Sequence, residues 1–378
     1  MQRFLSPLFA LAVLFCCELT QAAAPQPPSV VGRSWVVVDL SSNQVLAAEK
    51  ADERVEPASL TKIMTAYLVF QALRERKLAL AQPVPVSERA GRAPGSRMFI
   101  RTGARVAVDD LIRGMVVQSG NDACIALAEA VAGSEEAFVQ LMNQEAQRLG
   151  MKNTSFRNAS GLPDPQHYST AGDLHRLAAA LIRDFPDLYG QYYAQKEFRY
   201  NNISQPNRNR LLWLDPTVDG VKTGHTESAG YCLIASSKRG ERRLLSVVLG
   251  STSEAARAQE SQKLLNWGFQ SFDGVRLHGA NEAVRALEVW KGAEDSVKAG
   301  FPGDLVVTVP KGEADKLRSE LVSQQPLVAP VAAGQRVGTL RVTHDGKPLG
   351  EYPVVALEPV AAAGLLGRAW DTLRLWLK

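Results

Sequence analysis

A serine and a lysine three positions apart, Ser59 and Lys62, are the residues of this sequence that best fit nucleophilic catalysis. They lie in the segment Pro-Ala-Ser-Leu-Thr-Lys-Ile-Met (residues 57–64), where Pro57 favours a helix start and the following apolar residues recur at helical spacing. A serine hydroxyl is a weak nucleophile until a base takes its proton, and a lysine one turn on is such a base if its pKa is depressed. The segment therefore predicts a nucleophile and a base on a buried, rigid helix, although about one or two such spacings occur by chance in a chain this long.

Two further triplets accompany this pair. Ser119-Gly120-Asn121 lies at a helix-to-loop junction, and Lys222-Thr223-Gly224 lies in a strand pattern. Each triplet alone is a weak signal, and a second Ser-x-Asn at residues 41–43 is most simply a turn. The Ser-x-x-Lys and Lys-Thr-Gly motifs each occur once, however, and the three elements follow one another in the order used by active-serine penicilloyl enzymes.

The elements that must position these residues form an α+β pattern. Two strand patterns (34–40 and 44–49) are joined by a turn, four helical patterns follow (108–117, 122–131, 135–149 and 171–183), and three strand patterns return (219–222, 230–237 and 243–249). A helical block between two groups of strands predicts one domain, residues 25–272, whose antiparallel sheet is closed by both ends of its chain.

A second domain is expected over residues 273–359. Strand-length runs at 283–289, 305–309, 327–331 and 338–342 alternate with glycine and proline turns, which indicates a small all-β domain without candidate chemistry. The length of 378 residues fits roughly two domains. A net charge of +4 without a basic, aromatic-rich run excludes nucleic acid as a partner.

The first 24 residues are typical of a secretory signal peptide. Arg3 precedes an apolar stretch over residues 8–17, and Ala22 to Ala24 provide small residues for cleavage. The apolar stretch is too short to cross a bilayer as a helix, so export is expected. Cys16 and Cys17 would leave with the signal, and Phe15 before Cys16 argues against lipoprotein processing.

Cys124 and Cys232 remain in the mature chain. Both lie inside apolar patterns typical of buried small residues, so free thiols are favoured over a disulfide, which an oxidising compartment would nevertheless permit. The sequence has no metal-ligand spacing. No metal and no cofactor are expected.

The last stretch, residues 361–378, is amphipathic. Leu366, Trp370, Leu373 and Trp376 fall on one helical face, while the charged residues fall on the other. Burying those charges in a span would cost about 2.5 to 3.5 kcal/mol each, so the pattern favours a helix lying flat on a membrane surface. The alternative is a terminal helix packed against its own protein.

The chain resembles the low-molecular-mass penicillin-binding proteins, which are serine-type D-alanyl-D-alanine carboxypeptidases. The resemblance covers nearly everything after the signal, including Gly161-Leu162-Pro163 and the segment from Asn207 to Trp213. Arg210 departs from the pattern, where a smaller residue such as glycine is expected. The resemblance implies a periplasmic enzyme, anchored peripherally to the cytoplasmic membrane, that trims peptidoglycan pentapeptides and is acylated by β-lactams. A homodimer is compatible with the sequence.

The resemblance also implies roles for individual residues. Ser59 attacks the penultimate carbonyl, and the backbone N–H groups of Ser59 and His225 stabilise the oxyanion. Lys62 acts as the base, and crowding by Lys222 is expected to lower its pKa. The further assignments are Ser119 for proton relay, Asn121 for orientation, Lys222, Thr223 and Gly224 for an edge strand that pairs with the peptide, and Arg257 with Arg208 for the terminal carboxylate. Arg257 as a solvated helix charge and Arg208 as a loop charge remain alternatives.

Two other functions share the motifs. A class A β-lactamase needs a glutamate that activates the deacylating water, and Glu197 is the only glutamate between Glu145 and Lys222, next to a strand pattern. A non-catalytic cell-wall scaffold that binds β-lactams would not need every catalytic position filled. The carboxypeptidase interpretation is therefore favoured over both.

Overall fold

The structure is a computed structural model that describes residues 25–364 and residue 371. The expected signal peptide, residues 1–24, lies outside the described residues. The same holds for the expected terminal helix from residue 365 onwards, except Asp371.

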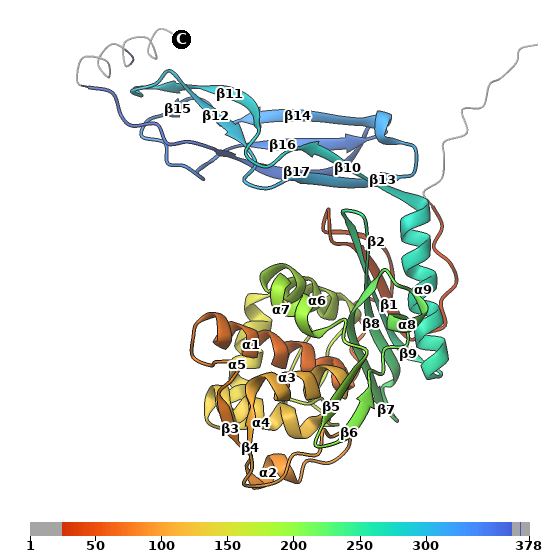
Figure 1. The fold of residues 1–378 in the computed structure, drawn as a ribbon. Helices are drawn as coiled ribbons and strands as arrows, with labels where there is room; N and C mark the ends of the chain where they lie inside the picture. The colour runs from red at the N-terminus through yellow and green to blue at the C-terminus, as the bar shows by residue number, and fades with distance from the viewer. Residues whose placement is uncertain (1–24, 365–370, 372–378) are drawn as a thin grey trace, which may run out of the picture.

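A five-stranded antiparallel sheet organises the larger domain (Figure 1). Its order is β2-β1-β9-β8-β7, built from β1 (Ser34–Asp39), β2 (Gln44–Glu49), β7 (Val218–Thr226), β8 (Gly230–Arg239) and β9 (Arg242–Ser251). β1 pairs with β9, so strands from the two ends of the domain lie side by side, as the sequence predicts. β1 alternates its side chains between two cores: Val36 and Val38 face the helical block, whereas Val37 packs in the cluster that contains Leu264.

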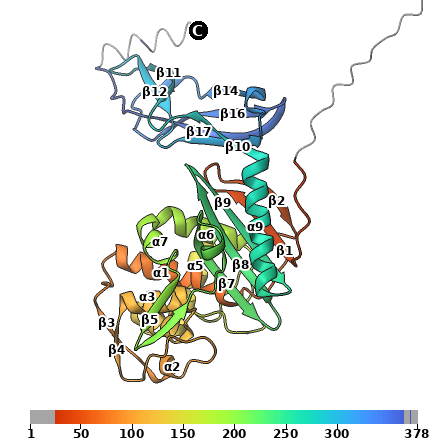
Figure 2. The same ribbon diagram turned by 45° about the vertical axis from the view of Figure 1, so that its right-hand side comes forward.

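Helices cover both faces of this sheet (Figure 2). The helices of this domain are α1 (Lys62–Arg74), α2 (Glu88–Gly91), α3 (Val108–Val117), α4 (Asn121–Ala132), α5 (Glu135–Arg148), α6 (Ala171–Asp184), α7 (Pro186–Tyr192), α8 (Leu211–Leu214) and α9 (Glu254–Ser271). Two small hairpins, β3 (Pro83–Pro85) with β4 (Arg105–Ala107) and β5 (Glu197–Tyr200) with β6 (Ile203–Pro206), border the block. Side chains of Ser134, Thr170 and Ser253 accept hydrogen bonds that cap the starts of α5, α6 and α9.

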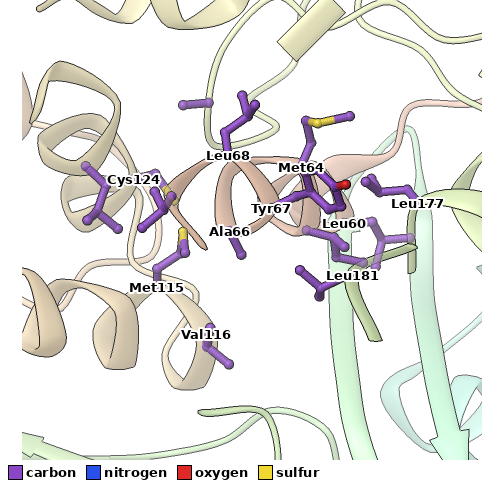
Figure 3. Close-up of a cluster of buried hydrophobic side chains, with 14 of the residues drawn as sticks. Leu60, Met64, Ala66, Tyr67, Leu68, Met115, Val116, Cys124, Leu177 and Leu181 are labelled. Carbon is purple, nitrogen blue, oxygen red and sulfur yellow. The ribbon is translucent and has the colours of Figure 1, made fainter. Parts of the chain in front are cut away.

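α1 lies at the centre of the helical core (Figure 3). All but three of its thirteen residues are buried, so it is apolar around nearly its whole circumference. Ala58–Thr61 form a 3-10 turn directly before it, which places Ser59 at the helix start and Lys62 as the first α-helical residue. The nucleophile and base of the sequence analysis thus sit on a helix that packing holds rigidly on all sides.

The second domain is all-β. Its strands are β10 (Phe272–His278), β11 (Ala283–Trp290), β12 (Ser296–Gly300), β13 (Leu305–Pro310), β14 (Leu317–Ser323), β15 (Leu327–Val328), β16 (Arg336–His344) and β17 (Lys347–Ala356). Six of them form a sheet of order β14-β16-β17-β12-β11-β15, and β10 pairs with β13. The strand expected over residues 327–331 ends at Val328, because Pro330 has no N–H to continue the ladder, and Val331 forms only an isolated bridge with Val360.

A polar seam of Asp39, Ser42, Gln44, Arg242 and Thr308 joins the two domains. The buried carboxylate of Asp39 accepts hydrogen bonds from Arg242 Nε (2.6 Å) and Thr308 Oγ1 (3.0 Å). Gln44 exchanges two bonds with the Thr308 backbone, at 2.6 and 3.1 Å, and the hydroxyls of Ser42 and Thr308 lie 2.6 Å apart. The β1–β2 hairpin of the larger domain is therefore bonded directly to β13 of the smaller one.

The chain leaves the β-domain in an extended conformation. Ala362 bridges Gly292, and Ala363 N–H donates to Lys291 O at 2.8 Å. The prediction of a helix from residue 361 is therefore wrong for residues 361–364, because their backbone groups pair with the β11–β12 turn. Within the described chain, none of the helices is long and apolar enough to cross a membrane.

Candidate active site

A cavity of about 380 Å³ opens between the helical block and β7. It is lined by Ser59, Gly95, Ser96, Ser119, Arg208, Thr223, Gly224, His225, Tyr231, Glu254 and Arg257. Three further candidates, Lys62, Asn121 and Lys222, are buried beside it. Segments up to two hundred residues apart in sequence thus bring every predicted site residue to one place.

Lys62 contacts three oxygens. Its Nζ lies 3.0 Å from Ser59 Oγ, 2.8 Å from Asn121 Oδ1 and 2.6 Å from the carbonyl oxygen of Ser160. The side chain is 1% exposed. The expected contact between nucleophile and base is therefore present, and two other oxygens hold the amine in place.

The environment of the site makes Lys62 lose its proton more readily than a free lysine does. Burial lowers the pKa of Lys62 to about 8, and the positive charge of Arg208 contributes in the same direction. The sequence analysis attributed this to crowding by Lys222, which is wrong about the main cause. Burial is also the largest effect on Lys222, and the charges of Lys62 and Arg208 lower its pKa further, well below the usual value.

Asn121 is fixed in one orientation. Its Nδ2 donates to Pro94 O and its backbone N–H to Ser96 O, both at 2.7 Å, so Oδ1 is left to face Lys62. The neighbouring Asp122 carboxylate accepts from Met98 N–H and Phe99 N–H at 3.0 and 2.9 Å. The start of α4 thereby holds the loop that forms one wall of the cavity.

Ser119 precedes α4 in a left-handed backbone conformation, with φ of +67°. Such a value is uncommon for a residue other than glycine and is found at functional sites more often than elsewhere. Its Oγ is buried and has no hydrogen-bond partner among the described residues, although the residue lines the cavity. The hydroxyl is thus held at the site without being engaged by neighbouring protein groups.

The opposite wall is β7, the edge strand of the sheet, as expected for the Lys222-Thr223-Gly224 segment. Arg257, from α9, is buried and its Nη1 donates to Gly224 O at 3.2 Å, so it is not a solvated helix charge. Arg208 is exposed but lines the cavity, whereas Arg210 is exposed and is not among the lining residues.

The sequence analysis named Gly161-Leu162-Pro163 only as part of the resemblance and missed that the turn before it contacts Lys62. Asn158 Oδ1 accepts hydrogen bonds from the backbone N–H groups of Ser160, Gly161 and Leu162, which shapes a tight turn that aims Ser160 O at Lys62. Gly161 has φ of +83°, and a Cβ there would lie 1.8 Å from Ala58 O. An asparagine three residues before a glycine could have indicated the turn, but not its target. Tyr231 and Glu254 at the rim were also missed.

A hydroxyl beside a buried amine of lowered pKa, with an edge strand and a buried arginine around one cavity, is typical of active-serine peptidases. Residues 21–253 match the D-alanyl-D-alanine carboxypeptidase family, and residues 272–362 match the family described as the C-terminal domain of penicillin-binding protein 5. The chain belongs to the D-alanyl-D-alanine carboxypeptidase family, and it is an enzyme of that class.

Individual relatives and solved structures support this family assignment. The chain is 44% identical to D-alanyl-D-alanine carboxypeptidase DacC of Escherichia coli (strain K12) over 95% of its own length and 92% of that protein. The crystal structure of penicillin binding protein 5 from Haemophilus influenzae, 40% identical, superposes with a TM-score of 0.84 and covers 89% of this chain and 99% of that one. Penicillin-binding protein D2 from Listeria monocytogenes, solved in an ampicillin-bound form, is 30% identical with a TM-score of 0.59, covering 65% of this chain and all of that one.

Proposed function

We propose that Ser59 is the nucleophile and Lys62 the base of a D-Ala-D-Ala carboxypeptidase acting on peptidoglycan pentapeptides. The observation that carries this proposal is the set of three oxygens around Lys62 Nζ. A neutral amine has two N–H donors and one lone pair. The carbonyl of Ser160 and Oδ1 of Asn121 only accept, so they take both donors. The lone pair then faces the Ser59 hydroxyl and receives its proton.

Acylation follows from this arrangement. Ser59 Oγ bonds to the carbonyl carbon of the penultimate D-alanine as its proton passes to Lys62, and the backbone N–H groups of Ser59 and His225 stabilise the oxyanion. Ser119 relays the proton to the leaving amine, terminal D-alanine departs, and the acyl-enzyme remains. Water then attacks the ester, which releases the shortened peptide and restores the Ser59 hydroxyl.

Substrate binding uses the opposite wall. The peptide pairs as an extended strand with Thr223 of β7, supported by Lys222 and Gly224. Its terminal carboxylate binds Arg257, with Arg208 assisting from the rim. Arg257 suits this role because a buried guanidinium gains most from an anionic partner, and a planar one can bind a carboxylate at two points.

β-Lactams acylate the same serine, and the adduct should persist. Glu254 is the one carboxylate among the described residues that line the cavity, and it lies beside Arg257. A glutamate placed to activate water next to an acylated Ser59 is the feature that a β-lactamase needs. We therefore expect slow deacylation, because Glu254 is paired with Arg257 and the described lining of the cavity offers no second carboxylate.

Intact mass measured over time with benzylpenicillin tests both points. The wild-type protein should gain one penicilloyl group that decays slowly, and Ser59→Ala should gain none and release no D-alanine from a pentapeptide. Ser204→Ala, which removes an exposed hydroxyl on β6, is the matched control and should label normally. Labelling of the Ser59 variant would refute the assignment, and rapid loss of the adduct from wild type would favour the β-lactamase.

We propose further that the protein is exported by residues 1–24 and that residues 360–378 hold it at the periplasmic surface of the cytoplasmic membrane. Residues 25–272 would then be the catalytic domain and residues 273–359 a β-domain between it and the membrane. Each large apolar side chain of the tail contributes on the order of 1.5 to 3 kcal/mol on entering lipid. Arg368, Arg374 and Lys378 add about 1 kcal/mol each at an anionic surface.

Truncation after Gly364 tests the anchor, since it keeps the bond between Ala363 N–H and Lys291 O. The truncated enzyme should no longer sediment with anionic vesicles, while its turnover of a soluble peptide stays unchanged. A full-length Trp370→Ser/Trp376→Ser variant should also lose vesicle binding. Sedimentation of the truncated chain, or loss of soluble activity, would show that the tail is structural instead.

A further inference from the structure

A carboxylate shares the cavity with the residues assigned to bind a carboxylate. Glu254 is the first residue of α9, and Arg257 lies one turn later on the same side. The side chain of Glu254 is 56% exposed and that of Arg257 only 3%. The acid thus lies at the mouth of the cavity, in front of the buried guanidinium.

The contact between them is loose. Glu254 Oε1 is 3.4 Å from Arg257 Nη2, and the other bond of the guanidinium to the described chain, to Gly224 O, measures 3.2 Å. Charge-assisted bonds of this kind usually measure about 2.7 to 2.9 Å. Arg257 therefore retains the capacity to bind a second carboxylate more closely than it binds Glu254.

The negative charge of Glu254 stabilises the charged form of Arg257 but repels a carboxylate that approaches Arg257. Burial lowers the pKa of Arg257, and the negative charge of Glu254 is the leading effect that raises it. With the cavity empty, Glu254 supplies the counter-charge that a buried cation requires. When a substrate carboxylate approaches, the same negative charge repels it.

We propose that Glu254 is a specificity-determining residue: it competes with the terminal carboxylate of the substrate for Arg257 and disfavours a leaving residue with an acidic side chain. This inference rests on the proposed role of Arg257. The side chain of the leaving residue branches from the carbon next to the bound carboxylate, so it lies within reach of Glu254. A cationic side chain is accepted there, a neutral one is tolerated, and an acidic one is rejected.

Three soluble peptides that end in D-Ala-D-Ala, D-Ala-D-Lys and D-Ala-D-Glu measure this preference. For Glu254→Gln we expect kcat/KM to rise about threefold for the neutral peptide and about tenfold for the acidic one, with little gain for the cationic one. The gains should shrink at high salt because the site is open to solvent. The acylation rate with benzylpenicillin, which carries a carboxylate, should rise as well.

Glu241→Gln is the matched control, since it removes one exposed charge at the opposite end of β8 from the cavity. It should leave the order of the three peptides unchanged. Unchanged or lower kcat/KM for the acidic peptide in Glu254→Gln would refute the proposal. Arg257→Gln distinguishes failure of the role of Glu254 from failure of the role of Arg257. If Arg257→Gln lowers kcat/KM for all three peptides while Glu254→Gln has no effect, only the role of Glu254 fails. If neither variant has an effect, the role of Arg257 fails too.

Discussion

We predict that the lowered pKa of Lys62 sets the pH dependence of the enzyme. Burial brings this pKa from 10.5 to about 8. At pH 7 about one molecule in ten then has a neutral lysine, against about three in ten thousand at the pKa of a free lysine. If only the neutral amine accepts the Ser59 proton, as proposed, the lowered pKa increases the active fraction roughly 300-fold, with burial as the main cause.

The pH profile of kcat/KM for a soluble acyl-D-Ala-D-Ala peptide tests this reasoning, since it reports ionisations of the free enzyme. We expect activity to fall about tenfold per pH unit below an apparent pKa near 8. Arg208→Gln removes a charge that lowers this pKa, so its acidic limb should lie at higher pH whatever happens to substrate affinity. Lys62→Arg should be inactive because a guanidinium stays protonated. A limb near pH 10 or activity in Lys62→Arg would each refute Lys62 as the base, whereas a limb unmoved in Arg208→Gln would refute the contribution of Arg208 to its pKa.

Three further predictions concern stability. The unfolded chain keeps a protonated Lys62 up to about pH 10.4, whereas the folded chain loses that proton near pH 8. As the pH rises between these values, the free energy of unfolding of wild type should increase by up to about 3 kcal/mol relative to that of Lys62→Met. A difference between the two unfolding free energies in urea that does not change with pH would contradict this. Gly161→Ala should lose about 2 to 5 kcal/mol, because its Cβ would lie 1.8 Å from Ala58 O at a positive φ, whereas Gly190→Ala, with open space around its Cβ, should change little. Thr308→Val removes a donor to the buried Asp39 and should lower the free energy of unfolding by about 1 to 3 kcal/mol, whereas Thr343→Val on the same domain should lower it much less. Equal melting temperatures of wild type and Thr308→Val would show that the seam contributes nothing to stability.

Side-chain patterns predicted the geometry of the site well where that geometry is local. Ser59 and Lys62 meet because helical spacing brings them together, and the expected helix over residues 108–117 has the bounds of α3. The edge position of Lys222 was implied by the resemblance to the penicillin-binding proteins, and β7 is indeed the edge strand of the sheet. The first two features depend on periodicity, which a sequence displays directly.

The contacts that complete the site left no such pattern. Lys62 is held by the carbonyl of Ser160, 98 residues away, and any residue type supplies a carbonyl. The lowered pKa of Lys62 comes mainly from burial, which depends on the packing around α1 and not on the neighbouring charge that the sequence displayed. The start of the tail was mispredicted because the ladder with Gly292 depends on where the β11–β12 turn lies in space.

The seam around Thr308 has a consequence for how far the enzyme reaches. Asp39 and Gln44 bond the catalytic sheet to β13 directly, and these bonds restrain the catalytic domain against the β-domain. If the tail holds the chain at the membrane, as proposed above, these bonds would limit the height of the Ser59 cavity above the membrane to the length that the β-domain spans. Pentapeptides within that layer of the wall would be trimmed and chemically identical ones further out would not. The enzyme would then select its substrates by their distance from the membrane as well as by their chemistry.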